Sequence, residues 1–222
     1  MSLKRAILAA VPAPIKESVK TFLREQKLRS VVADVQADPN PAAVSRLREA
    51  WGNTGYSADI DFLMQSARLA RATKGNILEC GSGVSTFLLA CLKIPVYTLE
   101  HDEEWARFCV SSIRRCGLDA NVIHAPLVSY GAHDWYRLPA DLPPISLVLC
   151  DGPPGTTRGG RGGLIPAVIH LLTPGCIILM DDVDRPEEHA LAEQWRDECG
   201  MEVEFIRGTT RMVAVLRKPS TP

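Results

Sequence analysis

The 222 residues suffice for one sizeable hydrophobic core but not for two independent ones. With 46% hydrophobic and 23% charged residues and a formal net charge of −1, the chain gives no sign of binding nucleic acid or an anionic membrane surface, so we expect neither partner. No apolar run reaches the length of a membrane span, and seven cysteines without CxxC spacing favour a reducing compartment, which predicts a cytoplasmic protein.

The first third of the chain has the pattern of helices, because apolar residues recur there at helical spacing. Asn40 and Pro41 predict an N-cap and a first helical turn, while Ser57 and Gly75 predict the start and the stop of a later helix. We expect residues 1–75 to form a helical segment that either caps the substrate side or builds a homodimer. The expected helices cover residues 14–35 (one helix or two), 41–51 and 57–74.

From residue 76 onward, short apolar segments alternate with amphipathic ones, which predicts strands separated by helices. Strands that are apolar along their whole length indicate a parallel sheet covered on both faces. The last two strands flank Gly208 without a helix between them, so we expect an antiparallel hairpin there. The expected strands cover residues 76–80, 95–100, 121–124, 145–150, 176–181, 201–206 and 212–217. The expected helices cover residues 85–93, 103–116, 163–172 and 186–199.

Residues 128–144 interrupt this alternation. They include His133, Trp135, Tyr136 and three prolines but contain no convincing helix. We therefore expect a long loop over the sheet edge, and long ordered loops tend to carry function.

A glycine-rich turn follows the first predicted strand, in the segment ECGSGVST that runs from Glu79 to Thr86. Gly81 and Gly83 permit a tight turn and a close approach of the backbone to a ligand. Glu100 ends the next strand about twenty residues later, where an acid can accept hydrogen bonds from both hydroxyls of a ribose. Together these features predict a nucleoside ligand. The alternative is a tight strand-to-helix turn with two solvated glutamates.

The identity of the nucleoside follows from two residues of this turn. Dinucleotide sites have a third small residue where Thr86 stands, and a carboxylate at Glu79 would repel a diphosphate. S-adenosylmethionine carries an ammonium and a sulfonium but no phosphate, so the acids favour it over NAD. A nicotinamide-dependent oxidoreductase is therefore the less favoured alternative, and a non-catalytic binding module with the same fold is the other.

The segment from Glu79 to Thr86 resembles motif I of class I S-adenosylmethionine-dependent methyltransferases, with Glu100 at their second-strand acid and Asp151 at their motif IV. The segments EHDEEW, DGPPG and DDVDR are similar to small-molecule, O-methyltransferase-like or uncharacterised members. The resemblance covers roughly the last two thirds of the chain. It implies an α/β fold with a Rossmann-like, doubly wound, seven-stranded and mostly parallel sheet in residues 76–222. It also implies methyl transfer to an oxygen of a small-molecule substrate.

The same resemblance assigns roles to individual residues. Glu79, Gly81, Gly83, Ser85 and Thr86 would hold the methionine part of the cofactor, Glu100 the ribose, and His101, Ala125 and Pro126 the adenine, with Asp151 also beside the cofactor. Asp151 and His133 are the candidate bases that remove the proton of the acceptor.

Three acids follow the fourth and fifth strands, namely Asp151, Asp181 and Asp182. Because the carboxyl ends of neighbouring parallel strands meet at one edge, these side chains should converge on the cofactor crevice. Catechol O-methyltransferase-like enzymes hold a divalent metal on similar acids, so the resemblance implies a Mg²⁺ site here. The alternative is that these acids cap helices or pair with nearby arginines, namely Arg158, Arg161 and Arg185.

Overall fold

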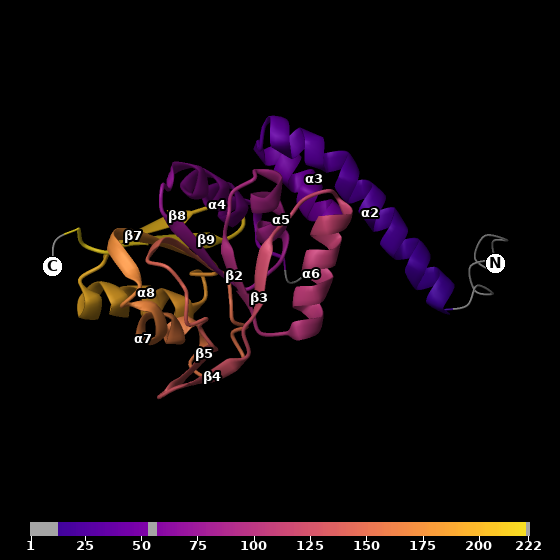
Figure 1. Ribbon diagram of the computed structural model, residues 1–222. Coiled ribbons are helices and arrows are strands. Elements are labelled where there is room, and N and C mark those ends of the chain that lie inside the picture. The colour runs from indigo at the N-terminus through magenta and orange to yellow at the C-terminus, as the bar shows by residue number, and fades with distance from the viewer. Residues whose placement is uncertain (1–12, 53–56, 221–222) are drawn as a thin grey trace.

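The structure is a computed structural model that describes residues 13–52 and 57–220 (Figure 1). The strands of its large sheet are β1 (Asn76–Cys80), β2 (Tyr97–Glu100), β3 (Asn121–His124), β6 (Ile145–Cys150), β7 (Leu172–Met180), β8 (Glu202–Arg207) and β9 (Met212–Arg217). They lie in the order β3-β2-β1-β6-β7-β9-β8. Neighbours are parallel from β3 to β7, whereas β9 is antiparallel to both β7 and β8. The predicted seven-stranded sheet and its C-terminal hairpin are thus confirmed.

Helices cover both faces of this sheet. They are α2 (Ala13–Ala37), α3 (Pro41–Trp51), α4 (Ile60–Ala72), α5 (Val84–Cys91), α6 (Glu103–Arg115), α7 (Leu164–Val168) and α8 (Pro186–Cys199). In β6, Leu147 and Leu149 contact a core shared with α2 to α6, while Val148 and Cys150 contact a second core shared with α7 and α8. Burial on both faces explains why the strand sequences are apolar throughout.

The N-terminal helices share the first core with the sheet. Trp51, at the end of α3, packs edge-on against Phe87 of α5 with 5.8 Å between ring centroids. Asn40 caps α3 as predicted, because its Oδ1 accepts a hydrogen bond from the N–H of Ala43 at 3.0 Å. The first twelve residues of the predicted segment 1–75 lie outside the described part of the chain.

Two predicted boundaries of α4 were wrong. The helix begins after Asp59, and the Ser57 hydroxyl instead donates to the carbonyl of Gly52 at 2.9 Å. The helix ends at Ala72, before Gly75. The absence of a side chain at Gly75 serves a close approach, since a Cβ there would lie 2.1 Å from Oγ of Ser146.

The start of α4 also holds the tip of the C-terminal hairpin. Asp59 accepts a hydrogen bond from the Thr210 hydroxyl, and Asp61 accepts one from the N–H of Thr209 at 2.5 Å. A Cβ on Gly208 would lie 2.2 Å from a carboxylate oxygen of Asp61. These hydrogen bonds therefore join the start of α4 to the tip of the β8–β9 hairpin, beside the carboxyl edge of the sheet.

The predicted loop over residues 128–144 is in part a second, two-stranded sheet. Strands β4 (Leu127–Tyr130) and β5 (His133–Tyr136) pair in antiparallel register. Trp135 and Tyr136 are 0% exposed and belong to the second core. Four-residue strands are too short to give a clear alternating pattern, which explains why the sequence did not predict them.

Two further properties concern the helices and the cysteine residues. Within the described ranges, no helix has both the length and the hydropathy needed to cross a membrane. All seven cysteines are free thiols, and Cys80, Cys150 and Cys176 are buried in strands as predicted.

Candidate functional site

A cavity of about 700 Å³ lies at the carboxyl ends of β1, β2 and β6. Strand order reverses between β1 and β6, and ligands of open α/β sheets bind at such a point. Its lining combines the turn after β1, the end of β2, the loop after β6, and parts of the N-terminal segment around Trp51 and Ala58. Another hollow of about 620 Å³ lies at the amino-terminal edge, around Gly75, Lys93 and Gly117. We place the site in the first cavity, because titratable groups converge there.

The glycine turn forms one wall of this cavity. Gly81 has a φ of 90°, a conformation that favours glycine, and a Cβ there would lie 3.4 Å from the backbone of Gly152. Gly83 is extended, and a Cβ on it would meet no described atom within 4 Å. Its backbone therefore faces open space in the cavity, as the predicted close approach to a ligand requires. Ser85 also lines the cavity.

Glu79 and Thr86 support the turn from behind. Glu79 is 1% exposed, and its Oε2 accepts hydrogen bonds from Thr86 at 2.8 Å and Thr98 at 2.7 Å. The Thr86 hydroxyl in turn accepts from the N–H of Gly83 at 3.0 Å. Burial raises the pKa of the Glu79 carboxyl against the opposing effect of these hydrogen bonds. Neither residue lines the cavity, and both hold the turn from behind, while their expected contact with a ligand stays a prediction.

Glu100 lines the cavity at the end of β2, as predicted. Its Oε2 accepts from the N–H of Ser82 at 2.9 Å and from the Ser82 hydroxyl at 2.8 Å. Its Oε1 accepts from the N–H of Asp102 at 3.0 Å and lies 2.9 Å from Nδ1 of His101. Burial alone raises the pKa of Glu100, but hydrogen bonds from His101, Asp102 and Ser82 outweigh it and hold the pKa below its ordinary value. The contact with the Glu100 carboxylate raises the pKa of His101.

The expected adenine contacts Ala125 and Pro126 do not line the cavity. Ala125 is 2% exposed, and its N–H donates to the carbonyl of Glu100 at 2.7 Å, which fixes the end of β3 beside β2. Three aromatic residues absent from the prediction line the cavity instead, namely Trp51, Trp105 and Tyr136. Trp105 donates from Nε1 to the carbonyl of Ser82 at 2.8 Å. Tyr136 reaches the cavity from β5.

Tyr136 has an unusual environment. Its side chain is 0% exposed, and its hydroxyl has no hydrogen-bond partner among the described residues. The hydroxyl lies close to Gly81 and Gly152, where Cβ atoms would be 3.7 and 2.3 Å from it. Burial raises the pKa of this phenol well above its ordinary value, so the group is a neutral donor. An unpaired buried donor is costly unless a ligand or water satisfies it.

His133 does not line the cavity. It lies against the loop after β6, since Cβ atoms on Gly159 and Gly162 would come within 2.4 and 2.7 Å of its ring. His133 therefore lies apart from the groups that line the cavity, and its role as a base stays a prediction. Asp151 lines the cavity, and burial raises its pKa to about 6 against the lowering effect of Arg161.

The three acids after β6 and β7 come together as predicted. Carboxylate oxygens of Asp151, Asp181 and Asp182 lie within 4.8 Å of one another. Asp151 and Asp182 line the cavity, whereas Asp181 is 0% exposed. Burial, together with the charges of the other two acids, raises the pKa of Asp181 well above its ordinary value.

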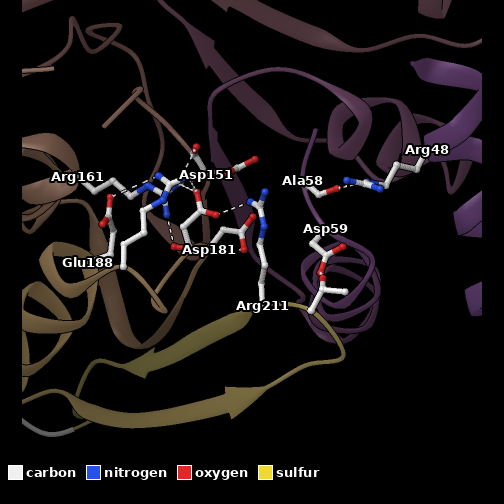
Figure 2. A network of polar contacts seen from close by, with 11 residues as sticks. Arg48, Ala58, Asp59, Asp151, Arg161, Asp181, Glu188 and Arg211 are labelled. Atoms are coloured by element: carbon white, nitrogen blue, oxygen red, sulfur yellow. Dashed lines mark hydrogen bonds and ion pairs between the residues drawn. The ribbon is translucent and has the colours of Figure 1, made fainter. Parts of the chain in front are cut away.

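Arginines already neutralise this cluster (Figure 2). Arg161 contacts Asp151 at 3.2 Å and Asp182 at 3.0 Å, Arg185 contacts Asp182 at 2.9 Å, and Arg211 also pairs with Asp182. Guanidinium groups contact both carboxylate oxygens of Asp182 and Oδ1 of Asp151, whereas Oδ2 of Asp181 has no partner among the described residues. A divalent metal held by all three acids would have to displace arginines from Asp182, so Asp182 as it lies does not fit the Mg²⁺ site that the resemblance implied. Arg158 lies apart from the cluster and pairs with Asp134 on the hairpin.

No protein-family model and no curated protein matches the sequence. Solved structures match the fold. A putative caffeoyl-CoA O-methyltransferase from Staphylococcus aureus is 15% identical with a TM-score of 0.61, over 86% of this chain and 98% of that one. A methyltransferase from Podospora anserina with SAH (S-adenosylhomocysteine) bound is 14% identical with a TM-score of 0.54, over 94% of this chain and 97% of that one. A methyltransferase from Geobacter sulfurreducens is 12% identical with a TM-score of 0.54, over 98% and 96%.

Proposed function

We propose that this chain, which has the fold of class I S-adenosylmethionine-dependent methyltransferases, transfers a methyl group from that cofactor to an oxygen of a small molecule. The observation that carries the proposal is the pairing of the open backbone at Gly83 with the ionised Glu100 in one cavity. The volume of about 700 Å³ is in the range of small-ligand pockets. The bound SAH of one structural neighbour and the acceptor oxygen named for another agree with it.

Glu100 would bind the ribose only after a local rearrangement. Its Oε2 already accepts two hydrogen bonds from Ser82, and its Oε1 accepts one from Asp102 and lies beside His101. Two of these four neighbouring groups are side chains that can rotate, the Ser82 hydroxyl and the His101 ring. Ribose hydroxyls would replace them, and the backbone N–H groups would keep the carboxylate in place.

The chemistry asked of the protein is modest, because S-adenosylmethionine supplies both the methyl group and the leaving group. The residues of this chain must orient the acceptor and remove its proton. Asp151 is placed for the second task, since it lines the cavity and its pKa of about 6 leaves it ionised at neutral pH.

The N-terminal segment has the position of a cap in this proposal. Trp51, Ser57 and Ala58 line the same cavity as Glu100 and Asp151. This contribution favours the capping role over the homodimer for residues 1–75. A homodimer and a cytoplasmic location both stay predictions.

Cofactor identity is tested by ligand stabilisation. SAH at a hundred times its dissociation constant should stabilise the protein by about 2.7 kcal/mol, because it binds the folded state alone. NAD and NADP should leave the melting temperature unchanged. Thermal melts with each ligand make the comparison, and stabilisation by NAD instead would favour the oxidoreductase. Formation of SAH from added S-adenosylmethionine, dependent on a hydroxylated small molecule as acceptor, would separate an enzyme from a non-catalytic binding module.

Tyr136→Phe tests whether the unpaired hydroxyl serves the cofactor. The change should lower SAH affinity about five- to fifteenfold, since one hydrogen bond to the ligand is lost. The melting temperature without ligand should stay the same or rise, because a buried hydroxyl without a partner disappears. Calorimetric titration and thermal melts measure the two effects. Tyr130→Phe is the matched control, because Tyr130 lies outside the cavity. Equal affinity in both variants would exclude Tyr136 from the cofactor site.

A further inference from the structure

Arg161 is the most deeply buried cation at the site. It belongs to the short 3-10 turn Gly160–Gly163, and its side chain is 3% exposed. Its Nη2 donates to Oδ1 of Asp151 at 3.2 Å, to Oδ2 of Asp182 at 3.0 Å and to the carbonyl of Asp151 at 3.1 Å. Its Nη1 donates to the carbonyl of Asp181. One guanidinium therefore contacts the carboxylates of Asp151 and Asp182 and the backbone carbonyl of Asp181. Figure 2 shows Arg161 beside Asp151 and Asp181.

We infer that the Arg161 guanidinium is the resident cation of this acidic cluster, in the place where a divalent metal would bind, and that it positions Asp151 at the cavity without a metal. The part that concerns Asp151 rests on the proposed function. The part that concerns the cation does not, because it follows from the contacts of Arg161 alone.

The charges support this inference. The cluster of Asp151, Asp181 and Asp182 carries at most three negative charges, and Arg161, Arg185 and Arg211 bring three positive ones. A divalent ion would add two positive charges to a group of acids that already has three arginines beside it. It would also have to displace guanidinium groups from the carboxylate oxygens that it needs as ligands.

The backbone around Arg161 holds the guanidinium where it is. A Cβ on Gly163 would lie 2.9 Å from Trp135, and one on Gly162 would lie 2.7 Å from His133, so the turn packs directly against β5. Because this turn is held against a buried strand, Arg161 cannot leave the cluster by a simple shift of a loose loop. A guanidinium is planar and always charged, so it fixes the carboxylates in direction as well as in charge.

A Mn²⁺ titration of the full chain, followed by electron paramagnetic resonance of the free ion, tests the inference. The wild type should leave Mn²⁺ free at millimolar concentration, whereas Arg161→Met should expose the carboxylates and raise the affinity for Mn²⁺ about tenfold or more. Arg158→Met is the matched control, because Arg158 belongs to the same loop but pairs with Asp134. It should behave as the wild type does. A folded Arg161→Met variant that gains no affinity would overturn the inference.

If Arg161→Met does not fold, the Mn²⁺ titration of the wild type tests the inference by itself. Mn²⁺ binding to the wild type that disappears in Asp182→Asn would show a metal in the cluster and overturn the inference. Binding that persists in Asp182→Asn lies elsewhere and leaves the cluster to Arg161, as expected. SAH titration of the same samples keeps the two proposals apart. A wild type that binds neither SAH nor Mn²⁺ would refute the methyltransferase and leave the resident cation standing.

Discussion

Replacing Asp151 with Asn should lower turnover by about a hundred- to a thousandfold, with any acceptor that the wild type methylates. Asn keeps the shape of the side chain and still accepts a hydrogen bond from Arg161, but it cannot take a proton from the acceptor. Positioned bases contribute rate factors of about 10² to 10⁴, which sets the expected loss. The affinity for SAH should change less than about threefold.

The pH dependence of the same variant gives a second readout. Burial raises the pKa of Asp151 to about 6, and a base works only when it is deprotonated. The wild-type value of kcat/KM should therefore rise as the pH passes about 6 and level off above it. Asp151→Asn should lose this rise, and Asp141→Asn, at an exposed position, should keep it. A profile that is unchanged in Asp151→Asn would assign the proton transfer to another group.

Glu100→Ala should weaken SAH binding by about ten- to a hundredfold and also lower the free energy of unfolding by about 3 kcal/mol. The affinity falls because charge-assisted hydrogen bonds to the ribose are lost. The stability falls because the side chain is 4% exposed and accepts from both N–H groups of Ser82 and Asp102, which would remain without partners.

Calorimetric titration well below the melting transition measures the affinity of this variant, and urea denaturation measures its stability. Glu104→Ala is the control, since Glu104 is exposed on the next helix and should change neither quantity. An unchanged affinity for SAH together with reduced stability would remove Glu100 from the ribose site and leave it a structural role.

The sequence predicts the sheet well because its strands are buried on both faces and therefore apolar throughout. It predicts the meeting of Asp151, Asp181 and Asp182 for a topological reason, since parallel neighbours end at one edge. The direction of Glu79 was also available from the sequence. Side chains alternate along a strand, so Glu79 faces the same side as Ile77, which is the side of α5 rather than the cavity.

Other features depend on packing that no local pattern records. Tyr136 reaches the cavity through a hairpin whose strands have four residues each. Arg158 and Arg161 were equal candidates as partners of the acids, and only the three-dimensional arrangement assigns Arg161 to the cluster. The sequence gives no sign that Arg211 belongs to this group, because it precedes β9 and meets Asp182 through the sheet order rather than through sequence proximity.

The hydrogen bonds between the hairpin tip and the start of α4 have a consequence for folding during synthesis. A ribosome releases Asp59 and Asp61 long before Thr209 and Thr210, and β9 must still insert between β7 and β8. Arg211 adjoins this tip, so it reaches Asp182 only when β9 docks. Until β9 docks, Asp182 therefore lacks its contact with Arg211. The glycine turn and β2 precede β9 in the chain, so they are synthesised before this contact can form.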